Sequence, residues 1–447
     1  MKETGRQERP PPVAGGEPEP PQGGDIRARW AWVEASVWTS RMLRALETGM
    51  EEGKWFRLID KVWSEKNLQS ALEQVLYNGG SAGVDGRSVA AVGKQSEEEI
   101  AILHRQLRAE NYEPAPVKRV WIPKQGSPEK RPLGVPIVRD RIMQTALRNV
   151  IEPIFERDFA PQSYGFRPGR GCKDALRRVD ELLKEGRVWV VDADIKGYFD
   201  TIPHGPLMER VERKIADGRV LRLIEGYLKA GVMESVKGWQ PTERGTPQGA
   251  VISPLLANIY LDPLDWEMAQ GSQEMVRYAD DFVVLCHSEE EARQALGRIQ
   301  DFAKANGLTL HPEKTRIVDA RKPGGFDFLG YHFERGMKWP RKKSMAKLKE
   351  VLRAKTRRTN GQSLTAICQE LNGLLQGWFE YFKHSKSNVF ATIDSYTRGR
   401  LRSILRKRRG GKGRGRGSDH QRWSNDFFHA QGLISLSQCL QAIHRSP

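Results

Sequence analysis

Residues 277–286, RYADDFVVLC, place two adjacent aspartates, Asp280 and Asp281, directly before a run of five apolar side chains. Such a run is typical of a buried strand, and a strand–turn–strand arrangement would expose both carboxylates at the tip of a β-hairpin. Two ionised carboxylates in contact repel each other, and burying them costs more unless a cation neutralises them. The stretch therefore predicts a hairpin tip that holds a positive ion. For the dipeptide alone, a merely polar turn is the simpler interpretation.

A second stretch, VDADIKGYFD at 191–200, again ends an apolar strand in carboxylates. Asp194 is the candidate here because an aromatic residue, Phe199, follows five residues later. Two or three carboxylates suffice for Mg²⁺, which takes hard oxygen ligands and keeps several waters. Two such ions about 4 Å apart clamp the attacking and leaving oxygens in phosphoryl transfer. Together the two stretches predict a two-magnesium site.

The charge of the chain indicates a polyanionic partner. Lys and Arg total 73 against 56 Asp and Glu, a formal net charge of +17. The excess lies in two segments, 341–358 with nine basic residues and one acid, and 398–422 with eleven and one. A solvated helix face usually intersperses acids among its bases, so nucleic acid is the favoured partner. The tract GGKGRGRG at 410–417 has no apolar face to insert into a membrane.

Length and cysteine use limit the class of protein further. A chain of 447 residues has room for two to four domains of roughly 100 to 200 residues. Its cysteines lie far apart without a C-x-x-C pair, which fits a reducing cytoplasm. The Pro/Gly-rich residues 1–24 are expected to form a disordered tail. Neither a secretion signal nor an apolar run long enough to cross a membrane occurs.

Periodicity predicts helices and strands in alternation, and hence an α+β fold. Strands are expected at 117–123 and 188–195, and a helix at 290–307. A further helix at 363–382 follows Ser363 as N-cap. Glycines at 373 and 377 argue against one unbroken helix there. The residues of that helix that fall on a helical repeat are Leu364, Ile367, Leu371, Leu374, Trp378 and Tyr381.

Large aromatic side chains gather near the N-terminus, within a pattern typical of helices. We expect them to pack a helical subdomain; stacking on nucleic acid bases is the alternative. They are Trp30, Trp32, Trp38, Trp55, Phe56 and Trp63.

Several long blocks of the sequence resemble the reverse transcriptases encoded within bacterial group II introns, in order and approximate spacing. YADD at 278–281 is similar to the reverse transcriptase signature, and the resemblance covers roughly residues 60–435. The blocks are RPLGVPIVRDRIMQTALRNVIEPIFERDFAPQSYGFRPGRG (131–171), DIKGYFDTIPH (194–204), GTPQGAVISPLLANIYLDPLD (245–265), LTLHPEKTRIV (308–318), FDFLGYHF (326–333) and the maturase-like LNGLLQGWFEYF (371–382).

The resemblance implies a right-hand polymerase with fingers and palm, an α-helical thumb and a basic C-terminal segment. We expect a helical N-terminal extension with the start of the fingers at 25–110, and the rest of the fingers with the palm at 111–335. The thumb or maturase domain is expected at 336–405. The basic nucleic-acid-binding segment is expected at 406–447.

On matching positions, the resemblance makes Asp194, Asp280 and Asp281 the catalytic and metal-binding carboxylates. The carbonyl of Ile195 would complete the ligand set. Phe199 would stand where an aromatic ring blocks a ribose 2′-OH, so that the enzyme selects deoxynucleotides.

Further residues match positions that handle the incoming nucleotide and the primer. Lys124 and Arg131 would hold the triphosphate, where cations stabilise charge that grows in the transition state. Gln248 and Gly249 would approach the nascent base pair, since Gly lets the backbone come close. Lys314 would protonate the leaving pyrophosphate, contact a phosphate, or support the fold. A grip on the primer end is implied for Phe328, Leu329 and Gly330.

The C-terminal segment is expected to bind RNA. Arg pairs bidentately with phosphates, and the Gly spacing lets the backbone follow an irregular RNA. Trp423, Phe427 and Phe428 would stack on bases or pack against the thumb. The candidate contacts are Arg406, Lys407, Arg408, Arg409, Lys412, Arg414 and Arg416.

The sequence departs from the family pattern at several places. Ala250 replaces a usual Gly in GTPQGA, and Pro203 stands where a polar residue is common. These changes put fidelity or template handling in doubt before activity. Many relatives end with an H-N-H endonuclease that contains paired cysteines. The chain stops at Pro447 with Cys439 nearby, and we expect it to lack that domain.

The leading hypothesis is an RNA-directed DNA polymerase that uses two Mg²⁺ ions and dNTPs. It would also bind its intron RNA, promote splicing, and support retromobility by target-primed cDNA synthesis. Its partners would be intron RNA, an RNA template with a DNA primer, and target DNA. The alternatives are a splicing cofactor with a relic polymerase site, or a reverse transcriptase of retron or defence type without an intron.

Overall fold

The computed structural model describes residues 25–49, 53–123 and 130–445 of the chain. The chain divides into two units, Met1–Ile317 and Val318–Pro447. The expected domain boundaries at 110, 335 and 405 stay predictions, because this division does not test them. The expected tail at 1–24 and the candidate Lys124 lie outside the described residues.

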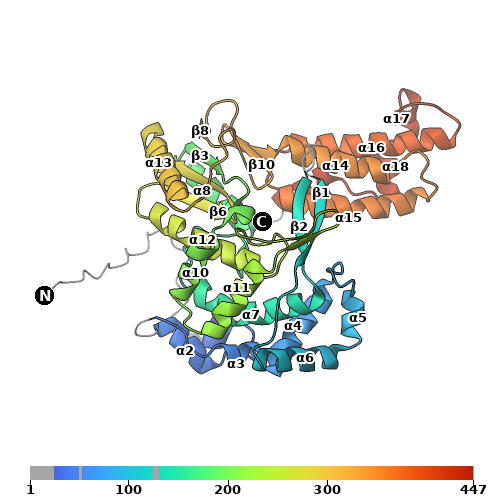
Figure 1. Ribbon diagram of the computed structural model, residues 1–447. Helices are drawn as coiled ribbons and strands as arrows, with labels where there is room; N and C mark the ends of the chain where they lie inside the picture. The colour runs from blue at the N-terminus through green and yellow to red at the C-terminus, as the bar shows by residue number, and fades with distance from the viewer. Residues whose placement is uncertain (1–24, 50–52, 124–129, 446–447) are drawn as a thin grey trace. The chain divides into compact units, whose positions relative to one another are not determined.

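The first unit begins with helices, after which helices and strands alternate (Figure 1). Its helices are α1 (Ile26–Arg29), α2 (Ser40–Thr48), α3 (Ile59–Val62), α4 (Glu65–Asn78), α5 (Val89–Gly93), α6 (Ser96–Arg108), α7 (Val138–Glu156), α8 (Cys172–Lys184), α9 (Tyr198–Thr201), α10 (His204–Glu212), α11 (Gly218–Lys229), α12 (Ser253–Met268) and α13 (Glu289–Ala305). Its strands are β1 (Val117–Pro123), β2 (Lys130–Val135), β3 (Trp189–Asp194), β4 (Val232–Glu234), β5 (Gly238–Gln240), β6 (Glu274–Tyr278), β7 (Asp281–Cys286) and β8 (Arg316–Asp319), within which the second unit begins.

The second unit continues with a short antiparallel sheet and a group of helices. Its elements are β9 (Phe326–Phe328), β10 (Tyr331–Glu334), β11 (Met337–Pro340), α14 (Lys342–Lys355), α15 (Leu364–Phe382), α16 (Asn388–Arg408), α17 (Ser418–Arg422), α18 (Asn425–Ala430) and α19 (Leu436–Arg445).

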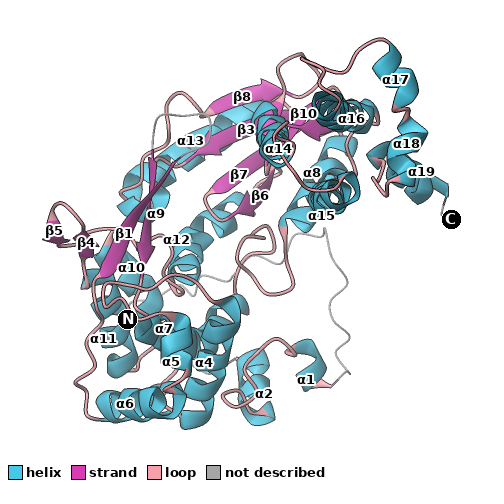
Figure 2. Cartoon of the chain, turned by 90° about the vertical axis from the view of Figure 1, so that its right-hand side faces the viewer, coloured by secondary structure: helices cyan, strands magenta, loops and turns pink. Residues whose placement is uncertain are grey.

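Strands β6, β7, β3 and β8 form a four-stranded sheet in that order (Figure 2). Helices α8, α12 and α13 pack against it. The central strands β3 and β7 pair in antiparallel from Trp189 opposite Cys286 to Asp194 opposite Asp281. Apolar side chains of these strands, such as Val191, are fully buried. Since side chains alternate between the faces of a strand, a shift by one residue would expose this core, and the register is therefore strongly specified.

Helix α7 lies at the centre of the N-terminal helices. It packs against α3, α4, α5 and α6 and is buried on nearly every side, polar residues included. A helix this deeply buried needs internal partners for its polar side chains. Asp140 accepts hydrogen bonds from the Tyr112 hydroxyl at 2.6 Å and from the Ala115 N–H at 3.0 Å.

Most of the N-terminal aromatic residues pack into the core, as expected for a helical subdomain. Trp38 is fully buried and donates its indole N–H to the Asn149 carbonyl at 2.9 Å. Phe56 is 67% exposed, so packing does not account for it. Three further tryptophans pack against the same core: Trp30, Trp55 and Trp63.

The predicted strands and helices formed close to their expected positions. Residues 117–123 are β1, and 188–195 contain β3. Helix α13 occupies most of the expected 290–307 and begins one residue earlier, at Glu289. The expected N-cap Ser363 accepts a hydrogen bond from the Ala366 N–H at the start of α15. These are local features, so the residues that specify them are neighbours in the chain.

Helix α15 departs from its sequence pattern in two details. The helix runs unbroken through both of its glycines, where added methyl groups would meet nothing within 4 Å. Its C-terminal half buries Leu375 and Phe379 rather than Leu374 and Trp378, which pack at the edge of the core. Residues 371–382 are apolar on several faces, so periodicity alone leaves the buried face open.

Among the residues that the structure describes, no helix combines the length and the hydropathy that crossing a membrane requires.

The buried Asp140 predicts a pH-dependent contribution to stability. Burial raises the pKa of Asp140 to about 6, although its hydrogen bonds from Tyr112 and Ala115 oppose this. The folded chain then holds the proton more tightly than the unfolded chain, in which the pKa is about 3.9. Stability should therefore fall as the pH rises from about 4 to about 6, by about 1.4 kcal/mol for each pKa unit of difference.

Asp140→Asn should remove this decrease, even if the substitution changes the free energy of unfolding by a constant amount at every pH. Denaturant unfolding at a series of pH values measures it, with the exposed Asp60→Asn as control. An unchanged pH profile in Asp140→Asn would show that another group causes the decrease.

Candidate active site

The hairpin predicted from RYADD is formed by β6 and β7. Tyr278 pairs with Asp281, which leaves Ala279 and Asp280 as the two turn residues. Ala279 has a φ of +60°, a left-handed conformation that residues with a Cβ rarely adopt. Asp280 therefore lies in the turn, and Asp281 begins β7.

Asp194 and Asp281 are direct cross-strand partners at the end of the β3–β7 pairing. Partners in an antiparallel pair have Cα atoms about 4.5 to 5.5 Å apart and side chains on the same face. Burial raises the pKa of Asp280, and the nearby charge of Asp194 raises it further. The three carboxylates that the sequence singled out thus come from two separate stretches to one edge of the sheet.

The three carboxylates are hard oxygen donors of the kind that Mg²⁺ takes, and a bound cation would relieve their mutual repulsion. In the part of the chain that the structure describes, no three His, Cys, Asp or Glu side chains are close enough to hold a metal ion. The chemical type and the charge of the three carboxylates nevertheless fit Mg²⁺. Ile195, the further expected ligand, is buried and directly follows Asp194.

Lys314 forms an ion pair with the Asp194 carboxylate. The segment before it is fastened to the end of β3, since the His311 N–H donates to the Asp194 carbonyl at 2.7 Å. The Lys314 side chain is 59% exposed. Its role stays a prediction, but its amine lies at the carboxylates, as a contact to a reacting phosphate requires.

Two arginines from the first hairpin, β1–β2, lie within electrostatic range of the site. The charge of Arg131 acts on both Asp280 and Asp200, and Arg119 acts on Asp200 as well. Burial raises the pKa of Asp200, and both arginines oppose that effect. Strand β2 is held here because the Gly134 N–H donates to the Gln248 carbonyl at 2.6 Å.

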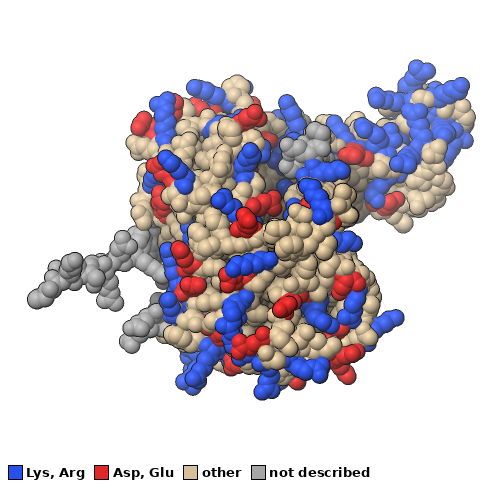
Figure 3. Space-filling view, viewed as in Figure 1, with Lys and Arg blue, Asp and Glu red and all other residues tan. Residues whose placement is uncertain are grey.

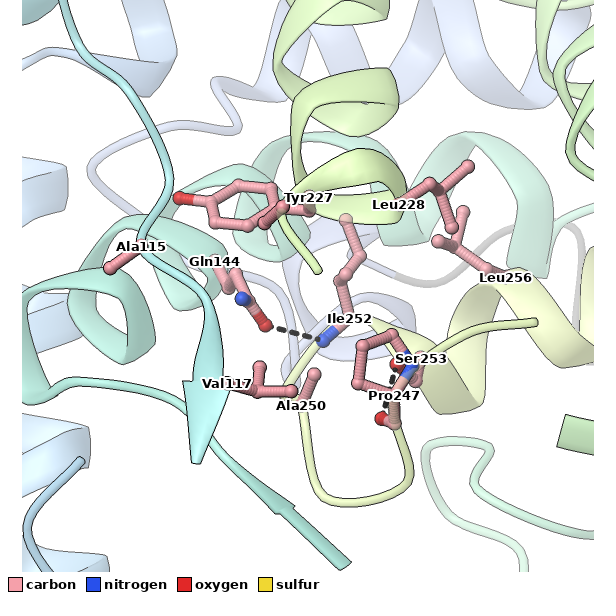
Figure 4. Close-up of a pocket in the computed structure, with 11 residues that line it drawn as sticks. Ala115, Val117, Gln144, Tyr227, Leu228, Pro247, Ala250, Ile252, Ser253 and Leu256 are labelled. Atoms are coloured by element: carbon pink, nitrogen blue, oxygen red, sulfur yellow. Dashed lines mark hydrogen bonds between the residues drawn. The ribbon is translucent and has the colours of Figure 1, made fainter. Parts of the chain in front are cut away.

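The loop that carries Gln248 and Gly249 is braced on both sides (Figure 4). Gln144 of α7 accepts hydrogen bonds from the N–H groups of Val251 and Ile252 at 2.8 and 3.3 Å. The Ser253 hydroxyl donates to the Pro247 carbonyl at 2.9 Å. The loop is therefore fixed by the core.

The Gln248 side chain is half-buried and directed toward α9. Its amide nitrogen donates to an Asp200 carboxylate oxygen at 3.4 Å. Gly249 allows the same loop to approach strand β2, since its φ is +106° and a Cβ there would lie 2.5 Å from the Gly134 carbonyl oxygen. The expected approach of Gly249 to a nascent base pair stays a prediction, because this close approach is to strand β2.

Phe199 lies in the short helix α9, directly beyond the end of β3. Its ring meets that of the buried Tyr198, with centroids 5.6 Å apart. The Thr246 N–H donates to the Phe199 carbonyl at 2.7 Å, so the backbone of α9 is held against the loop of Gln248. The ring is half-buried.

The expected primer-grip residues belong to the second unit. Phe328 is fully buried at the end of β9. Leu329 and Gly330 form the turn to β10, with φ values of +44° and +86°. The Tyr381 hydroxyl donates to the Leu329 carbonyl at 2.7 Å, so α15 fixes the position of this turn.

Basic side chains gather on the helices of the second unit (Figure 3). Arg406 donates to the Lys412 carbonyl at 2.8 Å and pairs with Asp419. Arg408 donates to the Asn360 and Gln362 carbonyls. These two arginines fasten the segment to the unit. The remaining candidates are exposed: Lys407, Arg409, Lys412, Arg414 and Arg416.

The aromatic residues beyond this segment pack within the second unit. Phe428 is 1% and Trp423 is 7% exposed, and Phe427 packs partly against the same core. Packing rather than base stacking therefore accounts for all three.

Sequence reasoning missed several residues that shape the site. Asp200 and Arg119 were not singled out, although Asp200 directly follows Phe199 in the chain. Arg277 was considered only as a basic neighbour of the two aspartates, yet it is fully buried. Arg277 directly follows two apolar residues in the chain; a charged residue buried beside them requires a partner, and that requirement was the available signal.

The site has carboxylates at a strand end, cations beside them and an aromatic ring next to the loop of Gln248, an arrangement that suits a nucleotidyl-transferring polymerase. Residues 122–333 match the reverse transcriptase (RNA-dependent DNA polymerase) family. Residues 345–423 match the maturase-specific domain of group II introns. The chain belongs to the group II intron-encoded reverse transcriptases and maturases, and so to the RNA-directed DNA polymerases.

Individual relatives support this assignment. Protein YkfC of Escherichia coli (strain K12) is 33% identical over 353 residues, which cover 69% of this chain and 86% of that protein. The group II intron-encoded protein LtrA of Lactococcus lactis subsp. cremoris is 36% identical over 54% of this chain and 41% of its own length. An uncharacterized 91 kDa protein in the cob intron of Schizosaccharomyces pombe is 31% identical over 53% of this chain and 35% of that protein. The chain thus spans less than half the length of the last two.

Gly165 predicts how sensitive the site is to small displacements. A Cβ at Gly165 would lie 2.8 Å from the Tyr278 carbonyl carbon and would also contact the Ala279 nitrogen, both of them backbone atoms at the turn that carries Asp280. Gly165→Ala should therefore displace the turn and lower the rate of primer extension by about 100-fold. The control is Gly297→Ala in α13, where a Cβ meets nothing within 4 Å. Equal rates for the two variants would show that the turn tolerates the displacement.

Proposed function

We propose that the chain extends a DNA primer on an RNA template, with Asp194, Asp280 and Asp281 as the ligands of two Mg²⁺ ions. The observation that carries the proposal is the cross-strand pairing of Asp194 with Asp281, next to Asp280 in the turn. Like charges directly opposite one another destabilise a sheet. A cation bound by the carboxylates of Asp194 and Asp281 would explain why this pair of like charges stands at the end of the two strands.

Cations around the carboxylates would handle the triphosphate. Arg131 lies within electrostatic range of Asp280, and the Lys314 amine contacts Asp194. Both are exposed side chains, so an incoming phosphate can reach them. Arg131 would stabilise charge that grows on the phosphate in the transition state, and Lys314 would donate a proton or a hydrogen bond to the leaving pyrophosphate.

The nucleotide would be selected by shape. The Phe199 ring would exclude a ribose 2′-OH by volume, and Gln248 with Gly249 would contact the nascent base pair. The bonds from Thr246 to Phe199 and from Gly134 to Gln248 hold these groups together. When bound at the carboxylates, Mg²⁺ would supply Lewis-acid stabilisation of the transferring phosphate and lower the pKa of the attacking hydroxyl.

Asp280→Asn tests the polymerase site. The change keeps the size of the side chain but removes one metal-binding charge, and primer extension should fall by about 100-fold or more. The assay uses the full chain with an annealed RNA template and DNA primer, dNTPs and Mg²⁺. The control is Asp192→Asn. Asp192 lies on the same strand as Asp194, but its backbone is opposite that of Val283 in the middle of the sheet rather than at the end of the strand.

Extension by Asp280→Asn at the wild-type rate would refute the site assignment. Absence of extension by the wild-type chain would refute the proposed activity itself.

For the second unit, we propose that its basic surface binds intron RNA, promotes splicing and supports retromobility by target-primed cDNA synthesis. The match to the maturase-specific domain supports the RNA partner. Burial lowers the pKa of Arg400, and the charges of Arg353, Arg358 and Arg414 lower it further. A phosphate backbone would relieve this repulsion. The cysteines are free thiols, which is compatible with activity in the cytoplasm.

The exposed basic residues predict a salt dependence. The variant Lys407→Gln, Arg409→Gln, Arg414→Gln, Arg416→Gln should weaken binding to intron RNA. For each phosphate that the variant no longer neutralises, the slope of log affinity against log salt should become shallower by about 0.7. The matched control neutralises four exposed side chains of the first unit by Lys66→Gln, Lys94→Gln, Arg105→Gln and Arg108→Gln. Equal slopes for the two variants would place the RNA-binding surface elsewhere.

A further inference from the structure

Arg277 is a fully buried arginine two residues before Ala279, the first residue of the turn that carries Asp280. It lies in β6, with 0% of its surface exposed. A guanidinium group stays charged in a protein, and burying one is costly unless every part of it is paired. The hydrogen bonds of its guanidinium group therefore indicate the role of this side chain.

Two of these contacts hold Arg277 to helix α12. Its Nε donates to Asp265 Oδ1 at 2.6 Å, and its Nη2 donates to the other oxygen of the same carboxylate. Asp265 is also fully buried. Nη1 donates to Asn258 Oδ1 at 3.0 Å, and Asn258 precedes Asp265 by about two turns on the same face of α12. The guanidinium plane is thus fixed by two side chains of one rigid helix.

The remaining contact joins this fixed group to the active site. Nη1 also donates to the Ala279 carbonyl at 2.8 Å. That carbonyl belongs to the peptide that leads directly into Asp280. Ala279 has a φ of +60°, a conformation that persists in a residue with a Cβ only where surrounding contacts enforce it.

The other side of the turn is closed by Gly165. Asn258, which accepts from Arg277, donates its own amide to the Gly165 carbonyl at 2.8 Å. The backbone of the Gly165 segment pairs with that of β6, since the Tyr164 N–H donates to the Arg277 carbonyl at 2.8 Å. The turn is therefore held between Arg277 and Gly165, and Asn258 contacts both.

We propose that Arg277 is a positioning residue for the polymerase reaction: through the Ala279 carbonyl it holds the turn that places Asp280 and Asp281. Asp265 and Asn258 in turn fix Arg277. This inference rests on the proposed function of the three carboxylates. A lysine cannot replace the arginine, because a single ammonium group cannot pair with both Asp265 oxygens and reach the Ala279 carbonyl as a planar fork does.

A purely structural role for the Arg277–Asp265 pair is the competing explanation. The two explanations differ when both charges are removed together. Replacing a buried ion pair by apolar residues of similar size is often neutral for stability or increases it. The double variant Arg277→Met, Asp265→Leu should therefore fold but lack the bond to the Ala279 carbonyl.

The experiment compares the wild type, this double variant and Arg277→Lys in primer extension by the full chain. We expect both variants to lower kcat by about 10- to 100-fold, since a displacement of about 1 Å has effects of this size. The Mg²⁺ concentration for half-maximal rate should rise, because the carboxylates are misplaced. The KM for dNTP should change by less than about threefold, because the variants leave unaltered the contacts that bind the nucleotide equally in the ground state and in the transition state.

The matched control removes another partly buried pair in the same unit, Arg139→Met with Glu99→Leu. Arg139 of α7 donates to the buried Glu99 of α6 at 2.9 Å, and Glu99 also pairs with Arg87. This control should keep kcat and the Mg²⁺ requirement close to the wild type. Thermal unfolding of every variant measures stability separately.

The outcomes decide between the explanations. A double variant with normal stability, kcat and Mg²⁺ requirement would overturn the proposal. If the double variant does not fold, Arg277→Lys decides, since it keeps a cation beside Asp265; wild-type kinetics in Arg277→Lys would also overturn the proposal. A wild-type chain that fails to extend primers refutes the proposed function instead, so the two failures are distinguishable.

Discussion

The antiparallel pairing that sets Asp194 opposite Asp281 is the constraint on which the site depends. Like charges directly across a pair of strands destabilise a sheet, so the carboxylates do not bring the strands together. A register shift by one residue would turn the core of the sheet toward solvent. Packing therefore holds the charges in an arrangement that they would not adopt alone. The side chains that provide this packing are fully buried: Val190, Val191, Val283, Val284 and Leu285.

Cations of two kinds surround these charges. Arg277 is buried and bound on several sides, so it cannot leave without exposing an unpaired charge to the interior. Lys314 and Arg131 are exposed and can exchange one partner for another at little cost, because water solvates them in between. The fixed cation suits the maintenance of geometry, whereas the exchangeable cations suit contact with a substrate that arrives and leaves.

How much of this could be predicted from the sequence depends on how far apart the interacting residues lie in the chain. The strand at 117–123 and the N-cap at Ser363 follow from neighbouring residues, and both were predicted. The carboxylates were found because each adjoins an apolar run, whereas their proximity was inferred from the chemistry of two metal ions and from the family resemblance. Nothing near Arg277 in the sequence indicates that its partner is Asp265 on a preceding helix, or that Gly165 must be small because the turn lies against it. Such contacts are set by the packing of distant segments.

The C-terminal basic segment contributes to the fold and is also the surface that we propose binds RNA. Trp423 and Phe428 contribute to the core of the second unit, and Arg406 and Arg408 bind Asp419 and backbone carbonyls. Fastening the segment in this way reduces the entropy that it would lose on binding RNA. The glycines between the remaining arginines still allow the exposed chain to adapt locally. The proposed affinity for RNA would then come from arginines whose backbone is already anchored, which is why the two structural arginines and the exposed ones have to be tested separately.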